Sequence, residues 1–161
     1  MTSTLPVFST LELIALGIFA LASLCLAWQD IRSFELDIRY EGLALIGALF
    51  SFFLHASKER LYQLGLNLSF WLIALILTVF YEERRQRTVL GGADFRYLLL
   101  LALMLRFESY VLLLPVACLL ALPHALTLLI KRSLGRAIPL IPYLLLSVIL
   151  LIISGRIESI V

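Results

Sequence analysis

The sequence predicts an all-α, polytopic membrane protein with about six transmembrane helices. This prediction rests on the composition, the clustering of the charged residues, and the length of the apolar stretches between the clusters. Apolar residues make up 62% of the 161 residues and charged residues only 15%, and the mean hydropathy is +1.04. A soluble domain of this length has too little interior for so much apolar surface. We therefore expect one domain, residues 1–161, embedded in a lipid bilayer.

The charged residues gather in short segments. Glu12 is the one exception, and all the others lie in 30–41, 58–60, 82–96, 106–108, 131–136 and 156–158. Nearly charge-free stretches lie between the segments, at 13–28, 43–54, 61–81, 97–105, 109–130 and 137–155. Each of these six stretches is a predicted membrane helix.

A membrane span requires about 20 apolar residues, and the six stretches meet this requirement to different degrees. The third, fifth and sixth are long enough alone. The first is long enough when Leu11 and Glu12 lie among the lipid headgroups. The second and fourth are short, so they must take in flanking residues, through snorkelling side chains or local thinning of the bilayer.

The basic residues predict the orientation, because cytoplasmic loops carry an excess of Lys and Arg. The segments 29–41, 82–96 and 131–136 lie on one predicted side of the membrane and carry nine basic residues, whereas the other side carries four. We therefore expect these three loops in the cytoplasm and both termini outside. The first basic residue is Arg32, so a cleaved signal peptide is not predicted and the first helix is expected to remain.

Other classes of function are disfavoured by the charge and the cysteines. The net charge of +2 is too small and too dispersed for a nucleic-acid-binding protein. Cys25 and Cys118 stand alone within apolar stretches, so they form neither a CxxC pair nor a zinc site. We expect both thiols to be buried and inert, and we expect no metal and no cofactor.

Two predicted cytoplasmic loops hold most of the polar information. The first reads WQDIRSFELDIRYEG, residues 28–42, and the second reads YEERRQRTVLGGADFRYL, residues 81–98. Asp30 closely follows the first apolar stretch, and Asp94 closely precedes the fourth. The predicted topology places both aspartates at the same depth on the same face of the membrane.

Two carboxylates at one depth suit water-mediated peptide hydrolysis. The ionised carboxylate acts as a general base on a water molecule, and the protonated one donates to the carbonyl of the cleaved bond. Because two close carboxylates cannot both ionise cheaply, such a pair shares a proton. This chemistry requires no metal.

A purely structural role would also explain these residues. Asp94 stands where a helix N-cap belongs, Asp30 is then an ordinary charge at a helix end, and Gly91 and Gly92 form a simple turn. Asp37 is a second carboxylate candidate in the first loop, and we expect it to face water.

The first loop resembles the first motif of the type IV prepilin peptidases, the small membrane aspartic proteases of G-x-G-D type. That motif is an Asp just after a membrane helix, followed by Arg and then by Ile-Pro-Asn. Asp30 and Arg32 match it, and Leu36 stands for the Ile. Asp37 and Ile38 replace the Pro and the Asn, so the motif is only partly present.

The second loop resembles the second motif of the same family, G-x-G-D followed by Lys and Leu. The stretch GGAD at 91–94 corresponds to it, with Ala93 in place of the second Gly, Arg96 at the Lys position and Leu98 after it. A weaker similarity is RAIPLIPY at 136–143, near the start of the last helix. The resemblance covers most of the chain, because six helices and the 64-residue separation of the aspartates also fit.

The resemblance implies that Asp30 and Asp94 are the catalytic residues. The N-terminal end of the fourth helix would favour an ionised Asp94, which makes Asp94 the base and Asp30 the acid in this interpretation. The remaining motif residues are implied to bind the substrate or to shape the loops. These residues are Gly91, Gly92, Arg32 and Arg96, and the two glycines would let the backbone turn and approach the first helix or a substrate.

The implied function is an aspartic endopeptidase of the bacterial inner membrane that removes the cytoplasmic leader of prepilin or pseudopilin precursors. Larger relatives insert a methyltransferase domain with cysteine pairs, but residues 31–41 leave no room for one. We therefore expect cleavage without N-methylation, as in the small enzymes of Flp-type pilus systems. The alternatives are a non-catalytic membrane subunit of a pilus or secretion assembly, and a small transporter with polar groups near the midplane.

Overall fold

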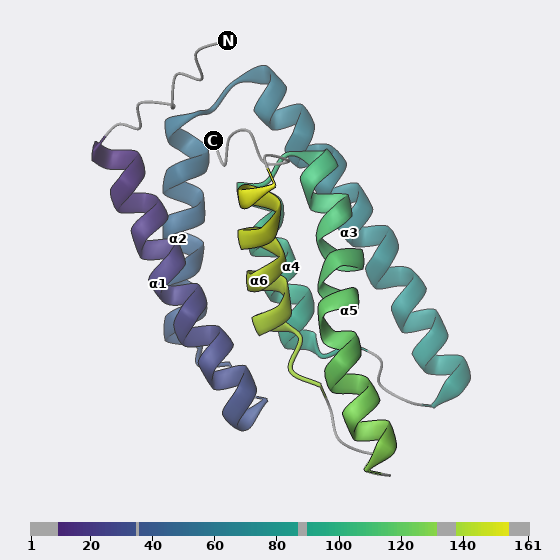
Figure 1. Ribbon diagram of the computed structural model, residues 1–161. Coiled ribbons are helices and arrows are strands. Elements are labelled where there is room, and N and C mark those ends of the chain that lie inside the picture. Colours follow the sequence, from purple (N-terminus) through teal and green to yellow (C-terminus); the bar gives the residue numbers. More distant parts are fainter. Residues whose placement is uncertain (1–9, 35, 87–89, 132–137, 155–161) are drawn as a thin grey trace.

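The computed structural model describes residues 10–34, 36–86, 90–131 and 138–154. These residues form six α-helices and no strand, which confirms the predicted all-α fold (Figure 1). The helices are α1 (Thr10–Ser33), α2 (Ile38–Leu54), α3 (Lys58–Arg85), α4 (Gly92–Met104), α5 (Phe107–Ile130) and α6 (Ile141–Ile153). Each helix overlaps one of the six apolar stretches.

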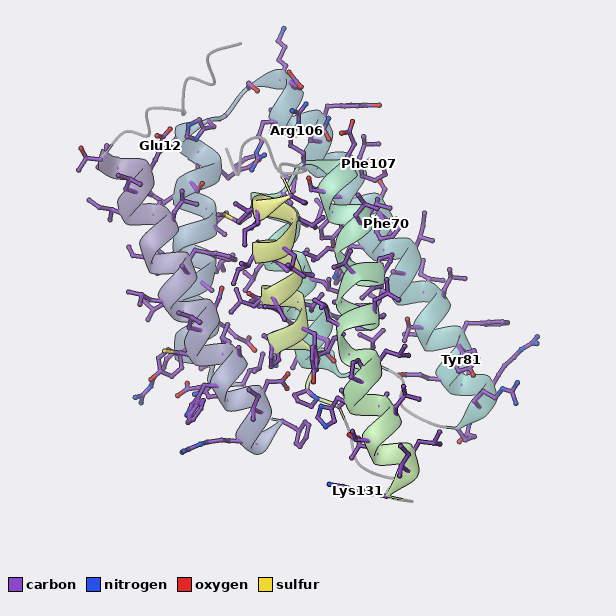
Figure 2. The ribbon with its side chains drawn as sticks, in the orientation of Figure 1. Glu12, Phe70, Tyr81, Arg106, Phe107 and Lys131 are labelled. Atoms are coloured by element: carbon purple, nitrogen blue, oxygen red, sulfur yellow. The ribbon has the colours of Figure 1, made fainter. Side chains whose placement is uncertain are left out.

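The helices alternate in direction, so that α1, α3 and α5 run one way and α2, α4 and α6 return (Figure 1). Figure 2 shows Glu12 and Arg106 at one end of the bundle, and Tyr81 and Lys131 at the other. We call the second end the Asp30 end, where α1, α3 and α5 finish and α2, α4 and α6 begin.

Three of the described helices are long and apolar enough to cross a membrane, namely α1, α3 and α5. α2 has 17 residues, and α4 and α6 have 13 each. A helix of that shorter length measures about 20 Å, less than the ~30 Å hydrocarbon core. α6 is shorter than its apolar stretch because Pro139 restricts Ile138 to extended backbone, and the helix begins only at Ile141, beside Pro142.

α4 lies at the centre of the bundle, packed against α2, α3 and α5. Its side chains Tyr97, Leu98, Leu101 and Met104 are buried and belong to the main apolar core. The longer helices keep exposed leucine, isoleucine and phenylalanine side chains on their outer faces. In a bilayer these outer faces contact lipid tails, whereas α4, which carries Asp94, is enclosed by protein.

Side chains of α3 donate hydrogen bonds to the last backbone carbonyls of the short helix α4. The two buried residues of α3, Arg60 and Asn67, are both polar. Arg60 donates hydrogen bonds of 3.0 and 2.7 Å, and Asn67 donates bonds of 2.9 and 2.8 Å, to backbone carbonyls at the end of α4. The acceptors are Leu103 and Met104 for Arg60, and Ala102 and Leu105 for Asn67. The last carbonyls of a helix lack intrahelical partners, and leaving them unpaired away from water is costly.

Trp71 of α3 contacts the opposite end of α4. Its indole N–H donates a hydrogen bond of 2.9 Å to the carbonyl of Phe95, and the two rings pack edge to face with centroids 6.4 Å apart. Phe95 directly follows Asp94 in the chain. α3 therefore fixes α4 at both of its ends, including the turn that carries the carboxylate.

Gly47 brings α2 close to α1. A Cβ atom at Gly47 would lie 2.9 Å from the backbone nitrogen of Phe19 and 3.0 Å from the carbonyl oxygen of Ala15. Real Cβ atoms do not approach backbone so closely, so only glycine allows this packing. The contact places α1, which carries Asp30, against α2.

Candidate active site

Asp30 lies in the last turn of α1, and its side chain is buried, with 4% of the residue exposed. Its Oδ2 accepts a hydrogen bond of 3.0 Å from the backbone N–H of Ile141, the first residue of α6. The first N–H groups of a helix have no partner within the helix, and they favour a negative charge. The beginning of α6 therefore supplies a donor to the carboxylate that α1 carries.

Asp94 lies in the first turn of α4, ahead of the apolar stretch that begins at Tyr97. Its Oδ2 accepts a hydrogen bond of 3.1 Å from the backbone N–H of Gly91. The preceding residue, Leu90, donates its backbone N–H to Oε1 of Glu82 at 3.2 Å. Glu82 is near the end of α3, so this bond ties the start of the GGAD stretch back to that helix.

Asp30 and Asp94, which are 64 positions apart, line one pocket of about 690 Å³. The remaining walls come from α5 and from residues near the helix ends, namely Phe34, Leu90, Gly91, Ala93, Ile138 and Leu140. Phe34 has a positive φ of 57° and closes the end of α1 through a hydrogen bond from its N–H to the Asp30 carbonyl. The structure therefore brings together the two aspartates that the sequence placed at one depth.

Burial of the carboxyl group is the main reason why the pKa of Asp94 is raised to about 6, and the charge of Asp30 is the second. The Gly91 hydrogen bond lowers this pKa, but it is outweighed. We had expected the N-terminal end of the helix to favour the ionised form of Asp94. The direction is the opposite, because loss of water around the carboxyl group has the larger effect.

Gly91 and Gly92 differ in what surrounds them. A Cβ atom at Gly91 would lie 3.3 Å from Oδ2 of Asp94, whereas one at Gly92 would meet nothing within 4 Å. Neither glycine has the positive φ that would require glycine. The backbone conformation therefore does not itself require glycine at either position, and the close approach of the Asp94 carboxylate is what Gly91 permits. The predicted loop-shaping role of both glycines stays a prediction.

Arg32 and Arg96, which were expected to bind substrate or shape the loops, are not among the residues that line the pocket. The guanidinium of Arg32 lies 4.5 Å from the ring centroid of Trp28, in a cation–π contact within α1. Arg96 forms an ion pair of 3.0 Å with Glu41. This ion pair links α4 to α2.

Asp37 is exposed, as the sequence predicted, and it does not line the pocket. It is the N-cap of α2, where its Oδ1 accepts a hydrogen bond of 2.9 Å from the N–H of Arg39. Its own N–H donates to the side-chain oxygen of Gln29 at 2.9 Å. Asp37 therefore has a structural role in the turn between α1 and α2.

The prediction that both cysteines are buried was wrong. Cys118 is exposed on α5 and lines the pocket, and Cys25 is partly exposed on α1. In α5 apolar residues cover every side of the helix, so no periodic pattern marks the face that meets the aspartates. Ile141 was also missed, because the donor is a backbone group and its partner lies 111 positions earlier.

The described helices and the pocket define a polytopic membrane protein with a pair of carboxylates at one end of the bundle. A sequence model of the type IV leader peptidase family matches residues 4–126, and the chain belongs to this family. This membership gives it a leader peptidase-like, proteolytic function. No curated protein and no solved structure matches the chain. The family match ends within α5, so α6 lies outside it.

Proposed function

We propose that the protein is an aspartic endopeptidase of the bacterial inner membrane that cleaves the cytoplasmic leader of Flp-type pilin precursors. Asp30 and Asp94 are the catalytic pair. One observation supports this proposal above the others: the two carboxylates, far apart in sequence, line the same pocket and interact electrostatically. A helix cap alone would not require a second carboxylate beside it.

The environments of the two aspartates suggest their roles. Asp94, whose pKa is raised to about 6, is the member that holds the shared proton and acts as the acid. Burial raises the pKa of Asp30 as well, but this carboxylate also accepts the N–H of Ile141, which favours the ionised form. Asp30 acts as the base for this reason. These roles are the reverse of those that the position of Asp94 at a helix N-terminus implied.

The reaction then proceeds in two steps. Asp30 takes a proton from water, the resulting hydroxide attacks the carbonyl carbon, and Asp94 donates its proton to the carbonyl oxygen. The tetrahedral intermediate returns that proton to Asp94 as the C–N bond breaks, and Asp30 gives its proton to the leaving amine. The leader and the mature chain are released, and the pair regains its starting protonation.

The position of the site suits a membrane-embedded precursor. The Asp30 end joins the three loops that are richest in basic residues, which favours a cytoplasmic location. A charged leader would remain in the cytoplasm while the apolar helix that follows it lies in the bilayer. α1 ends at Ser33 and α2 begins at Ile38, so the link between them leaves no room for a methyltransferase domain, and the product is expected to be unmethylated.

The whole chain acts as one peptidase domain in this proposal. α6 lies beyond the segment that the family model matches, yet its first residue donates to Asp30. α6 also packs against α1 and α5. The donor from α6 is the reason to include residues after 126 in the catalytic unit.

Co-expression with Flp-type pilin precursors tests the proposal, with leader removal read as a shift on a gel. We expect the wild-type chain to shorten at least one precursor and the Asp94→Asn variant to leave it intact at equal membrane levels. Mass spectrometry of the mature product should find a free, unmethylated N-terminus. If the wild-type chain cleaves no precursor but assembly of a pilus still requires it, the protein is a non-catalytic subunit instead.

A further inference from the structure

The pocket that holds the two aspartates continues onto one face of α5. That face, which we call the α5 face, consists of Leu114, Cys118, Ala121, Leu122 and Ala125. These positions recur at the spacing of a single helical stripe. Between the first and the last of them the helix rises about 16 Å, roughly half the thickness of the hydrocarbon core.

The α5 face is apolar and formed in part by small residues, and it is only partly open, since Ala121 is buried. None of its members is charged, Cys118 is exposed and 53% of Leu122 is exposed. Cys118, Ala121 and Ala125 have short side chains, which allow another helix to approach closely in a membrane. A charged segment could not be accommodated here without loss of its hydration.

We propose that the α5 face seats the first turns of the precursor's apolar segment, directly after the bond that is cleaved. This inference rests on the proposed function and adds the subsite. The supporting observation is continuity, because one pocket contains both Asp30 and Asp94 and the α5 face. A chain whose cleaved bond lies between the carboxylates continues along α5 into the bilayer, and its charged leader points away into water.

The length of the α5 face along the helix determines how much of the precursor it contacts. About 16 Å of helix corresponds to roughly eleven residues, so the subsite reads about three turns of the apolar segment after the cut. Cys118 lies between Leu114 at the deep end and Ala125 nearer the Asp30 end. Because its side chain is small, Cys118 allows the precursor's apolar helix to lie close to α5.

A pair of variants on neighbouring residues tests the subsite. Cys118→Phe fills the α5 face, whereas Leu119→Phe places the same ring on a residue that is 68% exposed and does not line the pocket. For the precursor that the wild-type chain cleaves, we expect Cys118→Phe to raise KM about tenfold with kcat within about twofold. Leu119→Phe should leave both constants near their wild-type values.

Disulfide cross-linking tests the same contact without relying on activity. The enzyme keeps Cys118, carries Cys25→Ala, and carries Asp94→Asn to hold the precursor uncut. Single cysteines are placed along the first roughly twelve residues after the cut, and copper phenanthroline with oxygen is the oxidant. We expect cross-links at precursor positions three to four residues apart, as in a helix. The control enzyme has Cys118→Ala and Leu119→Cys in place of the native pair, and should cross-link weakly.

The outcomes separate the subsite from the proposed function. Cleavage by the wild-type chain, combined with equal cross-linking to both enzymes or with none, would overturn the subsite and leave the peptidase standing. Dimers joined through Cys118 that persist when precursor is present would assign the α5 face to a second copy of the chain. Absence of cleavage of any precursor by the wild-type chain would overturn the proposed function, and the subsite with it.

Discussion

The backbone N–H of Ile141 donates a 3.0 Å hydrogen bond to the carboxylate of Asp30, across 111 positions of the chain. The bond joins the last turn of α1 to the first residue of α6. It makes the position of one candidate catalytic group depend on the packing of the final helix. Because this bond needs only an acceptor oxygen, a substitution that keeps the oxygen tests the catalytic role of Asp30 apart from its structural role.

Asp30→Asn should abolish leader removal while leaving the fold intact. The side-chain oxygen of Asn can still accept the Ile141 N–H, but the amide cannot take a proton from water. We expect processing to fall by at least about a hundredfold, measured with a pilin precursor at matched membrane levels. Asp37→Asn is the control, because Asp37 is exposed and Asn is an equally good N-cap. Loss of processing in Asp37→Asn alone would mean that the wrong carboxylate in the first loop had been assigned.

Asp94→Asn should have an equally large effect, and the double variant should be no worse than either single one. Groups that act as a unit fail together, so their effects on rate do not add. The side-chain oxygen of Asn can still accept the N–H of Gly91, so a purely structural Asp94 would tolerate the change. Near-normal cleavage by Asp94→Asn would contradict the catalytic role and leave only the helix cap.

Activity should fall as the pH rises through about 6. The pKa of Asp94 is raised to about 6 by burial and by the charge of Asp30, and the protonated form is the proposed acid. Labelling of Asp94 by a carbodiimide, which requires a protonated carboxyl group, should decrease over the same range. In Asp30→Asn the midpoint of labelling should move to lower pH, because one cause of the shift is removed.

The raised pKa of Asp94 also makes the free energy of unfolding depend on pH. Between the usual pKa of 3.8 and about 6 the native state binds a proton at Asp94 that the unfolded chain releases. The contribution of Asp94 to stability therefore declines as the pH rises through that window.

For activity, a cleavage rate that is constant between about pH 5 and about pH 8 would contradict the assignment of Asp94 as the acid.

Gly91→Ala should reduce activity more than Gly92→Ala. The new methyl group at position 91 would lie 3.3 Å from Oδ2 of Asp94 and would push the carboxylate from its place, whereas the space around Gly92 is open. We expect kcat to fall about tenfold or more for Gly91→Ala, since small displacements of a reacting group are costly. Equal effects of the two changes would show that the approach of Asp94 to Gly91 is unimportant.

Asn67→Leu should destabilise the protein, because it leaves the carbonyls of Ala102 and Leu105 without their donor. Removing one partner of a buried hydrogen bond costs about 1–3 kcal/mol, which thermal unfolding in detergent can detect. Ser69→Ala is the control on the same helix, since Ser69 is exposed and its hydroxyl donates to the Gly65 carbonyl of its own helix. A melting temperature equal to that of the control would mean that α3 does not hold the end of α4.

Cysteine labelling in intact cells should find the Asp30 end inside. Ser33→Cys lies on the exposed end of α1, and Ala56→Cys is exposed between α2 and α3 at the opposite end. An impermeant maleimide added from outside should label position 56 and miss position 33. The reverse pattern would overturn the cytoplasmic location of the aspartates.

The number and order of the helices could be predicted from the sequence because a bilayer separates charged from apolar segments along the chain. The ends of the helices could not, since a helix continues past its apolar stretch wherever polar residues can cap it. α1 extends to Ser33, and Asp30 and Arg32 lie within its last turn rather than in a loop.

The aspartate pair could be predicted from motif and topology, but its surroundings depend on packing between helices that no sequence pattern marks. The place of Arg96 after GGAD predicts a residue that binds substrate or shapes the loop, but it does not reveal the ion pair with Glu41. The Ile141 donor and the α5 face arise from packing between helices that are distant in sequence. A wholly apolar helix such as α5 presents the same composition to lipid and to a pocket, so its sequence alone does not show which side meets the site.

α3 and α5 continue past the first residues of α4 and α6 at the Asp30 end (Figure 1). Asp94 and the Ile141 N–H that binds Asp30 both lie where these short helices begin, so they are recessed relative to the tips of α3 and α5. In a membrane this recess would place the proposed reaction within the headgroup layer and not in open water. The two products would then separate by partitioning: the polar leader dissolves in water, while the apolar remainder stays in the lipid. Religation is thereby disfavoured without any further input of free energy.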